Sequence, residues 1–273
     1  MKLYKLAPLC GVLLLAVISS GCSKLKARDQ LNKGVQAYRN AQFQPAIVYF
    51  KNAVQLDPSL LNARLYLATA YAQQYIPGGD SPENAKIAEQ AIDSFEDVMK
   101  MDPGNTTAIA SIAQIYYNQK KFDKAKEYQQ RRLAIEPNNP EPYYWIGVLD
   151  WATCFPRAQT VRKDHNIDMP KNPAHPDVLD PIPDKYREDL AAQNGPLVDE
   201  GVKALTKAIE LKPNDFDTMA YLNLMYRQKS EIDPDAGSRQ ADLKSAESWV
   251  EKALATKKAA AASSTTTGVV TNQ

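Results

Sequence analysis

Cys154, His165 and His175 are the residues of this chain best suited to metal chemistry, and Asp164 and Asp168 lie near them in the sequence. Thiolate and imidazole groups are ligands that Zn²⁺ prefers, but structural zinc motifs place them in tightly spaced pairs. The three residues match no such spacing, and Cys154 is expected at the end of a packed helix. We therefore expect a proline-rich loop with incidental histidines and neither metal nor cofactor. The alternative is a metal-dependent enzyme built on these three residues.

Other catalytic patterns are missing from the sequence. Nucleophilic catalysis needs an activated Ser or Cys with a base and an orienting carboxylate, and the chain has no nucleophile elbow or similar local signature. The segment 77–81, Pro-Gly-Gly-Asp-Ser, is interpreted as a turn, because no Gly-Lys-Ser/Thr follows it as a phosphate loop requires. We expect a protein that is not an enzyme.

The N-terminus has the pattern of a secretory signal peptide over residues 1–21. Lys2 and Lys5 precede an apolar run of 13 residues, which is shorter than the roughly 20 that span a bilayer as a helix. Ser-Ser-Gly then leads to Cys22, and this junction resembles the lipobox of bacterial lipoproteins, although Ser19 stands where that motif prefers leucine. The resemblance implies lipidation of Cys22 and a short tether at 22–26. The alternative is ordinary cleavage followed by secretion.

The lipobox resemblance also implies a location. A lipidated Cys22 would hold the chain in the bacterial cell envelope, facing the periplasm, and Ser23 after it favours the outer membrane over the inner. Loss of residues 1–21 would remove two of 33 basic residues and none of the 32 acidic ones, leaving a formal charge of −1. No basic excess then remains to attract nucleic acid. Cys154 would be the single free thiol, so no disulfide can form within the chain.

One block recurs through the chain with a period of 34 residues. It consists of a small residue, a large one four positions later, a small one three positions further on, and then proline. The prolines of the second and third copies are 34 positions apart, and the neighbouring gaps are longer by 11 and 42. Apolar residues between the blocks recur at helical spacing, so each period is two amphipathic helices. The copies are Ala46, Phe50, Ala53 and Pro58; Ala91, Phe95, Val98 and Pro103; Ala125, Gln129, Arg132 and Pro137; Gly201, Leu205, Ala208 and Pro213; and Ala246, Val250 and Ala253.

These helix pairs resemble tetratricopeptide repeats (TPRs), with Gly34 and Ala37 as small residues on the first helix and Phe43 and Phe122 at turns between paired helices. The segments 75–78 and 220–227 are also similar to a group of bacterial TPR envelope proteins. The resemblance covers residues 27–258 and implies an all-α fold, a right-handed α-α superhelix (solenoid) of about five TPR helix pairs. Insertions fall between helix A and helix B of repeats 2, 4 and 5, and the longest is the proline-rich segment 153–198. Residues 259–273, which are small and polar, are expected to form a disordered tail.

The TPR resemblance further implies a concave groove, lined in that family mainly by positions 2, 5, 9, 12 and 13 of each helix A. Aromatic, amide and guanidinium groups there suit a peptide, whereas packing between helices is the alternative role for each aromatic ring. Leu31 and Val35 stand where a subset of TPRs carries the Lys and Asn that hold a terminal carboxylate, so that clamp is not expected. The groove positions are Tyr38, Arg39, Gln73, Gln114, Tyr117, Asn118, Tyr144, Trp151 and Arg227.

Together these features predict a non-catalytic TPR scaffold or adaptor for protein-protein interaction in the bacterial cell envelope, anchored by its N-terminal lipid. Its partner would be a membrane-associated protein or peptide. A second hypothesis is a periplasmic binder of a small molecule or glycan fragment that uses Trp145, Trp151 and the long insertion as a lid.

Overall fold

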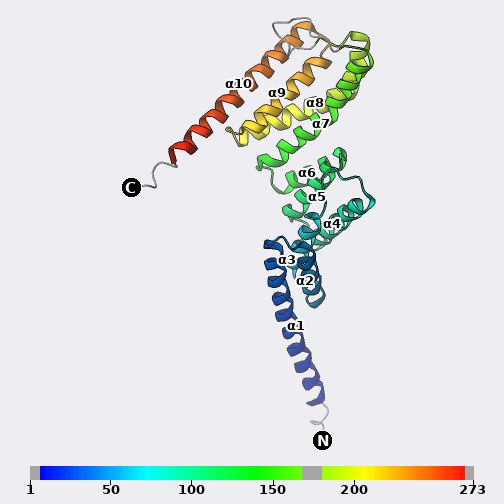
Figure 1. Cartoon of the computed structure of the whole chain (residues 1–273), viewed down its shortest axis with the longest axis vertical. Coiled ribbons are helices and arrows are strands. Elements are labelled where there is room, and N and C mark those ends of the chain that lie inside the picture. Colours follow the sequence, from blue (N-terminus) through cyan, green and yellow to red (C-terminus); the bar gives the residue numbers. More distant parts are fainter. Residues whose placement is uncertain (1–6, 168–179, 268–273) are drawn as a thin grey trace. The chain divides into compact units, whose positions relative to one another are not determined.

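The computed structural model describes residues 7–167 and 180–267, and every regular element in these two ranges is a helix (Figure 1). The chain divides into two compact units, residues 1–120 and 121–273. The first holds α1 (Ala7–Arg39), α2 (Phe43–Leu56), α3 (Leu61–Ala72), α4 (Pro82–Met101) and α5 (Thr106–Asn118). The second holds α6 (Phe122–Ile135), α7 (Pro140–Asp164), α8 (Asp184–Leu211), α9 (Phe216–Ile232) and α10 (Ala236–Thr267). The predicted all-α fold of about five consecutive helix pairs is confirmed.

In the unit 1–120, the helices pack in sequence order because small residues let them approach closely. Phe50 of α2 is fully buried and lies against Gly34 of α1, where an added β-carbon would come within 2.4 Å of the phenyl ring. Ala46 and Ala53 beside it are also fully buried. Ala41 has a φ of 57°, and this left-handed turn directs the chain from α1 into α2. The recurring small and large residues therefore form the contact between paired helices.

The insertion of the second repeat is a short loop held by one side chain. Asn84, which is 5% exposed, accepts a hydrogen bond from the Ile76 amide and donates to the carbonyls of Ile76 and Gly79, each at 2.8 Å. The Ser81 hydroxyl caps α4 by accepting from the Asn84 amide at 3.1 Å. These bonds fix the loop to the start of helix B.

In the unit 121–273, the long insertion is mainly helical, which corrects the prediction of a proline-rich loop at 153–198. Most of it lengthens α7 to 25 residues and α8 to 28 residues, and Pro156 and Pro196 lie inside these helices. Cys154 lies within α7, ten residues before its end, and is fully buried with Ala158 against α8. The buried surface between the two helices offsets the cost of proline in a helix interior. His175 lies outside the described residues.

The third copy of the repeat block keeps its helix although its second and third positions are polar. Gln129 and Arg132 of α6 are 4% and 5% exposed. Arg132 pairs with Glu141 at 2.9 Å and with Glu136 at 3.6 Å. A buried arginine is tolerated when carboxylates compensate its charge.

Both ends of the described chain are more helical than the sequence indicated. Helix α1 runs without interruption through residues 22–26, so the short tether predicted there is part of a helix. Helix α10 continues to Thr267, so residues 259–267 of the predicted disordered tail are helical, while 268–273 lie outside the described residues. A search of the described helices finds none with the length and apolar character needed to cross a membrane.

Candidate functional site

In the unit 1–120, predicted groove residues meet across successive A helices. Tyr38 of α1 is half-buried, lies edge-on to Phe43 with ring centroids 5.4 Å apart, and shares a hydrogen bond with Gln73 at the end of α3. Burial raises the pKa of Tyr38, and the bond with Gln73 opposes this rise. On α5, the exposed Gln114 donates from Nε2 to Oδ1 of Asn118 at 3.1 Å. Helix α3 contacts both α1 and α5, so these polar groups lie on three neighbouring A helices.

The remaining groove positions of this unit lie close to those pairs. Arg39 follows Tyr38 at the end of α1 and is exposed, whereas Tyr117 on α5 is half-buried. Amide and phenol groups at such positions can exchange hydrogen bonds with a peptide backbone.

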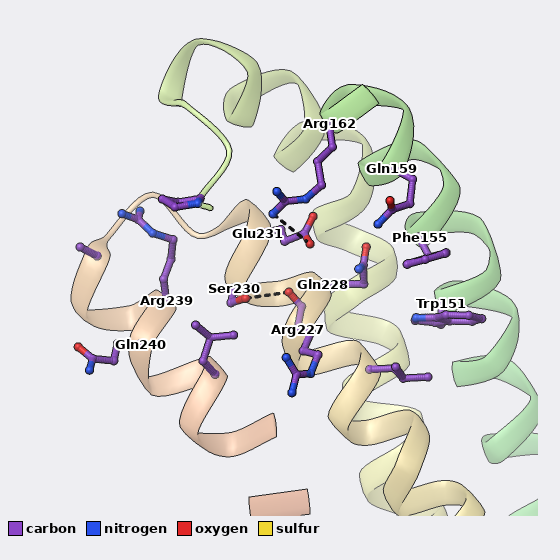
Figure 2. Close-up of a pocket in the computed structure, with 14 residues that line it drawn as sticks. Trp151, Phe155, Gln159, Arg162, Arg227, Gln228, Ser230, Glu231, Arg239 and Gln240 are labelled. Atoms are coloured by element: carbon purple, nitrogen blue, oxygen red, sulfur yellow. Dashed lines mark hydrogen bonds and ion pairs between the residues drawn. The ribbon is translucent and has the colours of Figure 1, made fainter. Parts of the chain in front are cut away.

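In the unit 121–273, α7, α9 and α10 enclose a cavity of about 310 Å³ (Figure 2). Its aromatic wall is Trp151 and Phe155 of α7, whose rings stack with centroids 5.0 Å apart and an interplanar angle of 21°. Trp151 also packs edge-on against Tyr221 of α9 at 5.7 Å. Leu224 and Leu243 add apolar surface from α9 and α10. The lengthened ends of three helices therefore build a pocket with one apolar side.

The polar side of the pocket is centred on a buried ion pair. Arg162, which is 2% exposed, lies 3.4 Å from Glu231 and donates to the carbonyls of Ile167 at 3.1 Å and Asp180 at 2.8 Å (Figure 2). Burial raises the pKa of Glu231, and the positive charge of Arg162 opposes that rise. Gln228, which is 4% exposed, lies one helical turn before Glu231 on α9.

A second charged cluster in this unit lies between α6, α7 and α8. Lys126 pairs with the fully buried Asp150 and, at 3.0 Å, with Glu200. Burial raises the pKa of Asp150 to about 7 against the effect of Lys126. Burial alone would lower the pKa of Lys126, but its two carboxylate partners raise it. The cluster therefore joins α6, α7 and α8 through charged side chains.

Cys154 and His165, two residues of the hypothetical metal site, each contact other residues of the protein. Burial raises the pKa of the Cys154 thiol to about 12, so it is protonated and unsuited to metal binding or nucleophilic attack near neutral pH. Asn194 of α8 donates to the Cys154 carbonyl at 3.1 Å. His165 is exposed and stacks on Tyr186 with centroids 3.6 Å apart. Within the described ranges no three His, Cys, Asp or Glu side chains are grouped to hold a metal ion.

The structure separates the predicted groove residues of this unit. Trp151 and Arg227 line the pocket, whereas Tyr144 packs edge-on to Trp145 and to Tyr221, each at 5.6 Å. Trp145 does not line the pocket, so of the two tryptophans proposed for a small-molecule site only Trp151 does.

Sequence reasoning missed Arg162, Gln228 and Glu231. A signal existed, since Phe155 and Arg162 are seven positions apart and share one helical face. It could be used only if α7 was expected to continue as a helix past Pro156. Cys22, the predicted lipidation site, has an exposed side chain on α1, and its modification remains a prediction.

Comparison with known proteins gives matches to TPR proteins. Residues 85–146 match the sequence model of the tetratricopeptide repeat. Interferon-induced protein with tetratricopeptide repeats 2 of Cricetulus griseus is 25% identical over 183 residues, covering 67% of this chain and 31% of its own. The Hsp70-Hsp90 organizing protein of Triticum aestivum is 28% identical over 115 residues, covering 42% and 18%. This chain therefore spans about a third or less of these relatives' length.

Solved structures agree on the fold. The crystal structure of MamA superposes with a TM-score of 0.53 at 16% identity, covering 84% of this chain and 96% of its own. YrrB, described as a TPR protein with an unusual peptide-binding site, gives a TM-score of 0.50 at 14% identity and covers 84% and 90%. At such identities the likeness shows the fold alone.

Proposed function

We propose that this chain, whose residues 85–146 match the tetratricopeptide repeat and whose fold is that of TPR proteins, is a non-catalytic scaffold that binds another protein or a peptide. The observation that carries this proposal is the hydrogen bond between Tyr38 of α1 and Gln73 at the end of α3, with Gln114 exposed on the neighbouring A helix α5; we take these positions as one A-helix face. Amide groups spaced along stacked helices can hold an extended peptide through its backbone. The described relatives named as an organizing protein and as a peptide-binding TPR protein support the same class.

The test is in-cell crosslinking of the tagged full chain, followed by mass spectrometry of what it captures. Gln73→Ala combined with Gln114→Ala removes two exposed amides from the A-helix face without opening a core. If each lost hydrogen bond costs about 1 kcal/mol of binding, capture falls roughly thirtyfold. The matched control is Gln90→Ala, which removes an exposed amide from α4, the B helix of the second repeat. Equal capture by the wild type and the double variant would reject this face as the binding surface.

We further propose that lipidated Cys22 holds the scaffold in the bacterial cell envelope, facing the periplasm, so that its partner is membrane-associated. The support is the signal pattern of residues 1–21 and the exposed side chain at position 22. Cys22→Ala is expected to move the protein from the membrane fraction to the soluble one, whereas Cys10→Ala, the control at the other N-terminal cysteine, leaves it with membranes. A Cys22→Ala protein that still fractionates with membranes would contradict the lipid anchor.

A further inference from the structure

The pocket in the unit 121–273 contains buried polar atoms that the described residues leave without a hydrogen bond. They are Nε of Arg162, Oε1 of Gln228 and Oε2 of Glu231, and all three residues line the cavity. Arg162 and Gln228 are more than nine-tenths buried. A buried donor or acceptor with no partner is unfavourable, so an atom of this kind beside a cavity points to a bound water or ligand.

The types of these atoms restrict the chemistry of the ligand. Two are acceptors and one is a donor, so the ligand must both donate and accept hydrogen bonds. Arg227 and Arg239 also line the cavity and would attract a carboxylate, but a carboxylate offers only acceptors and would leave the oxygens of Glu231 and Gln228 without a donor. An ammonium group would offer only donors and would face the guanidinium of Arg162. Hydroxyl groups donate and accept, and Glu231 already compensates the charge of Arg162.

The aromatic wall of the cavity restricts the shape of the ligand. Figure 2 shows Trp151 and Phe155 on α7, across the cavity from α10, and they form a stacked aromatic surface. A flat ring with aliphatic C–H groups on one face packs well on such a surface, while its hydroxyls reach the polar side. A volume of about 310 Å³ is at the lower end for ligand pockets, which suits one or two small rings.

We propose that this pocket binds a small, uncharged, polyhydroxylated ligand of the mono- or disaccharide class. The rings of Trp151 and Phe155 contact its apolar face, and Arg162, Gln228 and Glu231 bind its hydroxyls. This binding goes beyond the proposed scaffold and does not depend on it, because the amide face tested by crosslinking lies on α1, α3 and α5.

The experiment titrates the full chain, kept in a detergent without a sugar headgroup, with glucose, galactose, mannose, N-acetylglucosamine, maltose and cellobiose. Calorimetry and quenching of tryptophan fluorescence measure binding, and sodium benzoate and choline serve as anionic and cationic probes. We expect at least one of the sugars to bind with a dissociation constant of about 10 mM or tighter. Saturable binding of benzoate or choline without any sugar, or no binding of any probe, would overturn the proposal.

Variants locate the site. Trp151→Leu is expected to weaken sugar binding about tenfold or more, and Trp151→Tyr to restore part of it, since an aromatic face returns. Trp145→Leu, on the same helix but outside the pocket, is the matched control and should change the affinity less than about twofold. If Trp151→Leu loses helicity, Phe155→Ala replaces it, because that side chain is 37% exposed and its loss spares the core. Unchanged affinity in a folded Trp151 or Phe155 variant would place the sugar elsewhere.

Discussion

The contact between Gly34 and Phe50 gives a direct test of how the repeats are held together. Phe50 is fully buried among Ala37, Ala46 and Ile47, and a methyl group at position 34 would come within 2.4 Å of its ring. Gly34→Ala and Phe50→Ala therefore act on the same space, one by overfilling it and the other by emptying it. The overpacking caused by Gly34→Ala should therefore be relieved when Phe50→Ala is also present.

The magnitudes follow from burial. Phe50→Ala removes a fully buried ring, so it should lower the free energy of unfolding by about 3 to 5 kcal/mol. Gly34→Ala gains up to about 1 kcal/mol of helix propensity but loses about 1 to 3 kcal/mol to overpacking against a ring that cannot move into solvent. In the double variant the methyl group enters the space that the ring has left. Of the two effects of Gly34→Ala, only the gain in helix propensity then remains, while the loss caused by Phe50→Ala persists. The double variant should then be about 1 to 3 kcal/mol more stable than the sum of the single effects.

Urea unfolding of the full chain, followed by circular dichroism, measures all four members of this cycle. The transition that Phe50→Ala shifts belongs to the unit 1–120, since that residue packs only there. Asp199→Ala is the control, because that side chain is exposed on α8 in the other unit, and it should change the free energy of unfolding by less than about 0.5 kcal/mol with no coupling to Phe50. Additivity of Gly34→Ala and Phe50→Ala within about 0.5 kcal/mol would refute the close approach of α1 and α2.

Two further predictions concern buried titratable groups in the unit 121–273. Burial raises the pKa of Asp150 from its ordinary value of 3.8 to about 7, so the folded state binds its proton more tightly than the unfolded state does. That stabilisation is full below about pH 4 and is lost as the pH rises through 7, so the free energy of unfolding should fall by about 2 to 3 kcal/mol between pH 5 and pH 8 relative to Asp150→Asn. Parallel pH profiles of the two proteins would show that Asp150 titrates normally. Because burial raises the pKa of Cys154 to about 12, its thiol should react with a maleimide at pH 8 only after denaturation, measured in a Cys10→Ala, Cys22→Ala background that leaves Cys154 as the one thiol; rapid labelling of that protein in its native state would contradict the packed position.

The repeat architecture was predictable because its signals are local. Proline closes a helix wherever it follows one, and the spacing from Ala46 through Phe50 to Ala53 puts small and large residues on one helical face. Even the polar copy at Gln129 and Arg132 keeps this register, with nearby carboxylates compensating the charge. No knowledge of distant contacts was needed to count five helix pairs.

The secondary structure of the insertions could not be predicted from local signals in the same way. Pro156 and Pro196 indicate loops by local rules, yet both lie within helices because Cys154 and Ala158 on α7 find a partner surface on α8. The groove positions predicted from the TPR pattern have different surroundings in the structure, for a similar reason. Trp151 lines a pocket, while Tyr144 packs against other aromatic rings.

By itself, the sequence determined the helical repeat, its period and the places where the period is interrupted, because short-range patterns of proline and of small and large residues encode them. The tertiary structure alone decided that the interruptions of repeats 4 and 5 become longer helices and that these helices enclose a pocket. Arg162 and Glu231 are far apart in the chain, and only the packing of α7 against α9 places their charges 3.4 Å apart. Such a pairing depends on where whole helices meet, and no local pattern of residues carries that information.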